Sequence, residues 1–237
     1  MLDVHPPHHP THTWRDFFLH IATICVGLLI AIALEQAVEA LHRRHEHRQL
    51  QAALESESRQ IVRDTSDIET DETREIQWLR QCEAQISGAV RDHHLLAPLP
   101  TEPEVSWDIP DDPSYKAAKA STKLDLLSDE ETVAYGELDG TVALVQDQNK
   151  AESVAEHGYK RLLRQLGFAL PSGVNPLASA SPADLKELHS GIVEFEEAAI
   201  LMRDRGRVSR GAALALSQGE RDLHKIQAAE RQFDNLP

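Results

Sequence analysis

The chain has 237 residues, enough for one domain of ordinary size in addition to a membrane anchor. Its formal net charge is −15, and so acidic a surface repels phosphate backbones, which argues against binding to nucleic acid. Aromatic residues make up only 5% of the chain, and Ala, Leu, Glu, Gln and Arg are frequent, a composition that favours helices over sheets. We therefore expect an all-α fold.

Residues 1–12, MLDVHPPHHPTH, combine proline and histidine and show no hydrophobic periodicity. A terminal segment of this polar, proline-rich kind cannot bury an apolar face. We predict a disordered tail here.

Residues 13–41 contain the longest apolar stretch. From Phe17 to Leu34 there is no Asp, Glu, Lys or Arg. These residues would form a helix about 27 Å long, close to the roughly 30 Å hydrocarbon core of a bilayer. Trp14 lies where an interfacial aromatic residue is expected. We predict a transmembrane helix within residues 13–41, with the lipid bilayer as its partner.

A cleaved signal peptide is the alternative, because Ala31-Ile32-Ala33 matches a small-x-small cleavage pattern. Two features oppose it. The segment before Phe17 is not basic, and helix-favouring sequence continues past Ala33 without a breaker.

One face of the predicted span is small and polar. Thr23, Gly27, Ala31 and Glu35 follow one another at steps of four and share a helical face. Small residues let helix backbones approach closely in lipid, so this face predicts a homo-oligomer or a partner membrane protein. The alternative is that Gly and Ala are simply common in membrane helices.

Residues 42–92 contain no proline, and Gly88 is their only glycine, so we expect the helix to continue as a juxtamembrane amphipathic segment. An apolar seam resembling that of a coiled coil runs along it, with Glu57 as a charged position and one position missing; it comprises Leu50, Leu54, Glu57, Ile61 and Ile68.

Three arginines, Arg43, Arg44 and Arg48, follow the span closely enough to reach anionic headgroups at the membrane interface. Only Arg15 lies within reach on the other side. The positive-inside rule therefore favours a cytoplasmic C-terminal domain over a periplasmic one.

Residues 93–112 are rich in proline and predict a connector. Residues 113–235 predict several amphipathic helices. Their starts are marked by Asp112-Pro113, by Ser128 with Glu131, and by Ser181 with Asp184, which are capping patterns. Each helix must bury its apolar stripe on another, so we expect an antiparallel helical bundle after the long N-terminal helix.

The N-terminal sequence contains His5-Pro6-x-His8, Thr13-Trp14-Arg15-Asp16-Phe17-Phe18-x-His20-Ile21-Ala22-Thr23-Ile24, Gly27-Leu28-Leu29-Ile30-Ala31 and Leu34-Glu35-Gln36. With these residues it resembles a family of bacterial proteins. Members of that family have one transmembrane helix, a helical C-terminal region and no assigned activity. The resemblance implies a bacterial inner-membrane location and brings no catalytic residues.

No catalytic motif stands out, and we expect no cofactor. The histidines His42, His45 and His47 are spaced so that two of them could share a metal ion, yet no cysteine or paired carboxylate completes a ligand set. We therefore expect a membrane-anchored helical interaction or sensory scaffold module without evident catalysis. The alternative is a membrane-tethered metal-binding or enzymatic protein that uses these juxtamembrane histidines.

Overall fold

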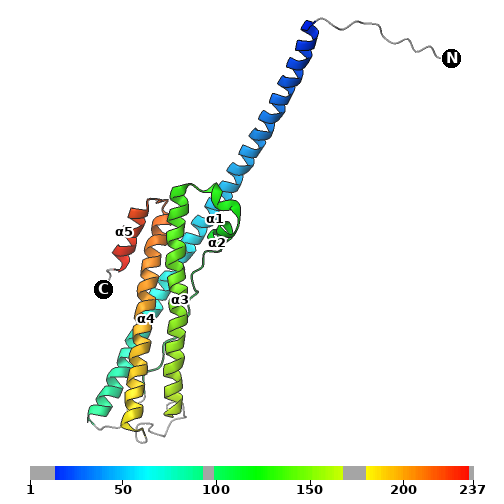
Figure 1. Cartoon of the computed structure of the whole chain (residues 1–237). Helices are drawn as coiled ribbons and strands as arrows, with labels where there is room; N and C mark the ends of the chain where they lie inside the picture. Colours follow the sequence, from blue (N-terminus) through cyan, green and yellow to red (C-terminus); the bar gives the residue numbers. More distant parts are fainter. Residues whose placement is uncertain (1–13, 93–98, 168–179, 235–237) are drawn as a thin grey trace, which may run out of the picture. The chain divides into compact units, whose positions relative to one another are not determined.

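The structure, a computed structural model, describes residues 14–92, 99–167 and 180–234. The predicted tail of residues 1–12 and part of the predicted connector lie outside the described residues. Within these ranges the chain has helices and no strand, which confirms the expected all-α class (Figure 1). The helices are α1 (Trp14–Asp92), α2 (Pro113–Ala120), the 3₁₀ helix η1 (Thr122–Leu126), α3 (Asp129–Gln165), α4 (Pro182–Ser217) and α5 (Leu223–Asp234).

The chain divides into two units, residues 1–49 and residues 50–237. In the first unit the described residues belong to α1, and every side chain from Trp14 to His45 is exposed. Among the described residues, one helix is long and apolar enough to cross a membrane. Its most apolar stretch has a mean hydropathy of 2.6, and none of that stretch is buried by protein.

In the second unit α1 and α3 run in the same direction. Where α1 enters this unit, Gln51 donates a hydrogen bond to Glu131 in the first turn of α3. Further along both helices, the rings of Trp78 and Tyr159 pack edge to face with their centroids 6.2 Å apart. The order of these contacts is the same on both helices.

Helix α4 runs the opposite way. Arg207 Nε lies 2.7 Å from Glu69 Oε1, whereas Glu196, earlier in α4, pairs with Arg80, later in α1, at 2.7 Å. Figure 1 shows α3 and α4 side by side over most of their length. Three helices thus enclose a shared core.

The core consists of three apolar clusters that follow one another along the helices. The first is centred on Leu54, Ile61, Val142 and Leu216; the second on Ile68, Val145 and Met202; the third on Leu79, Tyr159, Leu188 and Phe195. Of the residues predicted to form a coiled-coil seam, Leu54, Ile61 and Ile68 are therefore buried against α3 and α4 of the same chain.

The buried row on α1 departs from the predicted seam at its polar positions. Glu57 is only half-buried, and its Oε1 accepts a hydrogen bond from the backbone N–H of Ser114 at 2.7 Å. The fully buried neighbours are Ser58 and Thr65. Their hydroxyls donate to backbone carbonyls one turn earlier, at 2.9 and 2.6 Å, which satisfies them inside the core.

Two of the three predicted helix starts have the expected hydrogen bonds. Ser128 with Glu131, and Ser181 with Asp184, each form a reciprocal capping box. Asp112 precedes α2 as predicted but makes no side-chain cap hydrogen bond. Its buried carboxylate lies instead 2.9 Å from Lys116 Nζ.

Residues 99–112 have no helix or strand and lie along α1 and α3. Trp78 Nε1 donates to the carbonyl of Pro100 at 2.9 Å, and the N–H of Ser106 donates to Asp71 Oδ2 at 2.8 Å. Gln146 of α3 donates to the carbonyl of Pro110 at 2.9 Å. These bonds hold residues 99–112 against both helices.

Helix α5 packs closely on α4 and brings Ile226 into the core. The close approach depends on Gly211, where an added Cβ would lie 2.8 Å from the Cα of Glu230. The turn that precedes α5 contains Gly219 with φ +88°, a conformation that favours glycine.

Candidate functional site

The predicted transmembrane packing face lies on α1 in the first unit. Thr23, Gly27, Ala31 and Glu35 are all exposed there. Thr23 Oγ1 donates to the carbonyl of Leu19 at 2.8 Å, so its hydroxyl is satisfied within the helix. A Cβ added to Gly27 would meet no atom within 4 Å. No other part of the described chain covers this face.

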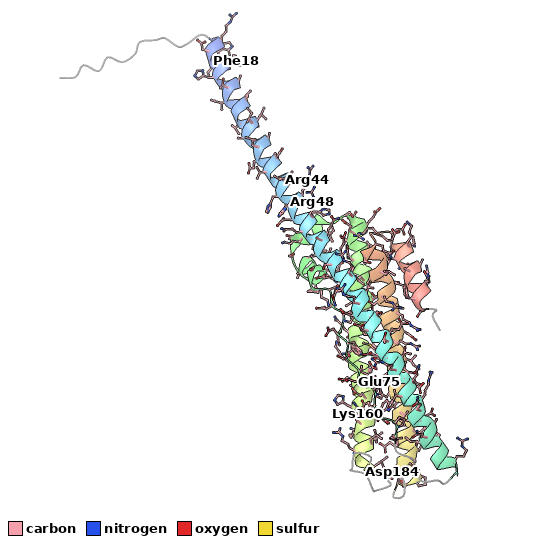
Figure 2. The ribbon with its side chains drawn as sticks, turned by 180° about the vertical axis from the view of Figure 1, so that it is seen from behind. Phe18, Arg44, Arg48, Glu75, Lys160 and Asp184 are labelled. Atoms are coloured by element: carbon pink, nitrogen blue, oxygen red, sulfur yellow. The ribbon has the colours of Figure 1, made fainter. Side chains whose placement is uncertain are left out.

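The predicted membrane-interface residues also lie on exposed helix. The Trp14 ring stacks on Phe17 at 5.7 Å and meets Phe18 edge to face at 5.0 Å. Further along, Arg43 pairs with Glu39 at 3.0 Å, while Arg44 and Arg48 are exposed (Figure 2). These positions are compatible with contact to headgroups.

The juxtamembrane histidines do not bring their ring nitrogens together as one ligand set. His42 lies 3.7 Å from Glu46, and His45 shares a 2.8 Å hydrogen bond with Gln49. Neither these two nor His47 belongs to a group of three or more potential metal ligands within 4.8 Å in the described part of the chain. The geometry therefore gives no support to a shared metal ion here.

A different group does converge in the second unit. Glu72 and Glu75 of α1 and Glu152 of α3 each offer a carboxylate oxygen, and these oxygens lie within 4.8 Å of one another. The three residues, which we call the carboxylate cluster, are 0%, 6% and 6% exposed, respectively. Among the described residues this is the only such group of three potential metal ligands.

The carboxylate cluster interrupts the apolar core. Ile68 lies one turn before Glu72 on α1 and belongs to the second apolar cluster. Ile76 lies one turn after Glu72 and belongs to the third. Figure 2 places Glu75 on α1 and Lys160 on α3.

Burial dominates the electrostatics of the cluster. It raises the pKa of Glu72 from 4.5 to about 10, with a further contribution from the Glu152 carboxylate. Burial first, and then the charges of Glu152 and Glu156, raise the pKa of Glu75 to about 7. Burial likewise raises the pKa of Glu152 to about 7. Three negative charges at this place are strongly disfavoured.

Glu72 receives no hydrogen bond from a donor outside the cluster. Its carboxyl group bonds that of Glu152, which raises the pKa of Glu72 and requires a proton on one of the two groups. The contrast with Glu69, one turn earlier on α1, is direct. That carboxylate lies 2.7 Å from Arg207 Nε and 2.6 Å from Arg210 Nη2. The same bundle therefore pairs one carboxylate with two arginines and leaves another, more deeply buried, without a cation.

Such an arrangement can retain protons or bind a cation, because either one neutralises buried carboxylates. The sequence did contain a signal. Ser58, Thr65 and Glu72 recur every seven residues, four positions after the apolar row of Leu54, Ile61 and Ile68. The predicted seam placed Glu57 beside the apolar row instead of Ser58, Thr65 and Glu72, and for that reason it did not include Glu72 as a core residue.

Comparison of the chain with models of protein families, with curated proteins and with solved structures found no match. The functional conclusion therefore depends on the residues and their geometry.

Proposed function

We propose that the protein is a membrane-anchored helical interaction module, with a sensory or scaffold role. In this proposal residues 13–41 span the bacterial inner membrane once, in keeping with the family resemblance, and the helix continues into a helical bundle in which α4 runs antiparallel to α1 and α3. The observation that carries the proposal is the apolar stretch of α1, which no described part of the chain buries. Apolar surface of that extent needs lipid or protein around it.

The module associates through the small polar face of the span. Thr23, Gly27 and Ala31 present little bulk, and none of the described residues covers the face. In lipid, association depends on close backbone approach rather than on apolar burial. A second copy or another membrane protein fits this requirement.

Crosslinking in membranes tests the association. Gly27→Ile adds bulk on the face and should reduce the crosslinked dimer several-fold. Val26→Ile is the matched control, because it adds one methylene about 100° around the helix from Gly27. Equal crosslinking of Gly27→Ile and wild type would refute the role of this face.

The count of arginines near the span supports a cytoplasmic second unit. Cys82 is a poor reporter of orientation, because it is fully buried and burial raises the pKa of its thiol to about 11. Lys150, whose side chain is 74% exposed, is a better site. With a membrane-impermeant thiol reagent, Lys150→Cys should react only after cells are opened. Reaction in intact cells would assign the unit to the periplasm.

A further inference from the structure

The carboxylate cluster raises a question that membrane anchoring does not answer: what neutralises it. A deeply buried carboxylate without a partner is costly, and proteins pair such charges with cations, metal ions or protons. The exposed fraction of Glu72 is 0%, and no donor outside the cluster reaches its oxygens. Its hydrogen bond with Glu152 needs a proton on one of the two carboxyl groups, and a bound cation would replace that proton. Its side chain is directed toward Glu75 and Glu152, since the ligand oxygens of all three lie within 4.8 Å of one another.

The nearby basic group is already engaged elsewhere. Lys160 Nζ lies 2.7 Å from Glu102 and 2.6 Å from Glu156. Its charge lowers the pKa of Glu75 only as a minor influence, against larger effects that raise it. No ion pair between Lys or Arg and any of the three clustered carboxylates occurs in the described structure.

The oxygen spacing suits a small divalent ion. Oxygens that contact one Ca²⁺ lie about 2.3–2.6 Å from it, so two of them can be up to about 5 Å apart. Separations within 4.8 Å satisfy that limit. All of the ligands are carboxylate oxygens, which suit Ca²⁺, Mg²⁺ and Mn²⁺ better than ions that prefer nitrogen or sulfur.

We propose that Glu72, Glu75 and Glu152 bind one divalent cation of this oxygen-preferring class, which fastens α1 to α3. The ion compensates most of the buried negative charge. Two of its ligands come from α1 and one from α3, so binding stabilises the packing of the two helices. Because carboxylates must lose their protons to bind a metal, affinity increases with pH.

Manganese alone is the probe. The full chain in neutral detergent is titrated with Mn²⁺, and free Mn²⁺ is followed by its electron paramagnetic resonance signal. Wild type should bind one ion per chain with saturation. Glu72→Gln and Glu152→Gln, which keep the side-chain shape, should each bind at least tenfold more weakly. Glu197→Gln, at an exposed position on α4, is the control and should bind like wild type.

Thermal unfolding of the same samples provides a second measurement. Mn²⁺ should raise the midpoint of wild type and leave that of Glu72→Gln unchanged, because a ligand stabilises only a fold that binds it. Absence of saturable binding in wild type would overturn the proposal. So would equal binding by wild type and Glu72→Gln, which would assign the ion to surface carboxylates. A chain that Glu72→Gln stabilises, and on which Mn²⁺ has no effect, would show that protons alone neutralise the cluster.

Discussion

Two helical glycines that differ in their surroundings allow a matched test of the packing of α5. At Gly211 of α4 an added Cβ would lie 2.8 Å from the Cα of Glu230 and 2.9 Å from the carbonyl oxygen of Ala229, both backbone atoms of α5. At Gly158 of α3 a Cβ would meet no atom within 4 Å. Gly211→Ala should therefore displace α5, whereas Gly158→Ala should not disturb the packing.

The expected magnitudes have opposite signs. Replacing a helical glycine by alanine gains about 0.5–1 kcal/mol in either helix. Displacement of α5 exposes Ile226, which is 0% exposed, and loses about 1.5–3 kcal/mol of apolar burial. The net effect is a loss of roughly 1–2 kcal/mol for Gly211→Ala and a gain of about 0.5–1 kcal/mol for Gly158→Ala.

Thermal unfolding of the full chain in detergent, followed by circular dichroism, measures both effects. Residues 50–237 form a unit for which 1 kcal/mol corresponds to about 2–4 °C in the midpoint. Proteolysis should also cleave near Gly219 faster in Gly211→Ala than in wild type. If Gly211→Ala proves as stable as Gly158→Ala, the close approach of α5 to Gly211 of α4 is refuted.

Two further predictions concern the core. In a chelating buffer the chain should lose stability as pH rises from about 5 to 8. The reason is that the folded chain keeps carboxyl protons that glutamates of the unfolded chain release above their ordinary pKa of 4.5. The loss continues up to a pH of about 7 for Glu75 and Glu152 and of about 10 for Glu72. The free energy of unfolding should fall by about 1.4 kcal/mol per pH unit for each retained proton, and Glu72→Gln should reduce this slope. A stability that increases over this range would contradict the assignment. Ile68→Ala removes a fully buried side chain that packs on Val145 and Met202 and should cost about 2–5 kcal/mol in denaturant unfolding. Val154→Ala, at a position 73% exposed, should stay within about 0.5 kcal/mol of wild type, and similar losses in both variants would contradict the placement of Ile68 in the core.

Much of the fold could be predicted from periodicity and caps. The scarcity of strand-forming residues predicted the all-α class, and Ser128 with Glu131 and Ser181 with Asp184 marked the starts of α3 and α4. These predictions succeeded because capping depends on neighbours within four residues.

The burial of Ser58, Thr65 and Glu72 on α1 could not be predicted from the sequence in the same way. A serine, a threonine and a glutamate at heptad spacing look like a solvated face in sequence. Ser58 and Thr65 are nevertheless buried, because each hydroxyl bonds to its own helix. The burial of Glu72 depends on α3, which brings Glu152 beside it from 80 positions later in the sequence. Spacing within one helix contains no information on that encounter.

Asp112 shows the limit of a local pattern in another way. The Asp-Pro sequence correctly marked the start of α2. Its carboxylate nevertheless turns to the Lys116 ammonium at 2.9 Å, because a salt bridge to a charged amine competes with a hydrogen bond to a backbone N–H.

Membrane attachment through α1 is the central claim, and alkaline carbonate extraction of cell membranes tests it most directly. Wild type should stay in the membrane pellet. Leu28→Arg with Leu29→Arg should move the chain to the supernatant, because two arginines at the centre of a span cost about 5–7 kcal/mol on the insertion scale. The control, Leu144→Arg with Val154→Arg, changes two exposed positions on α3 and should stay in the pellet. Release of the wild-type chain by carbonate would contradict the account.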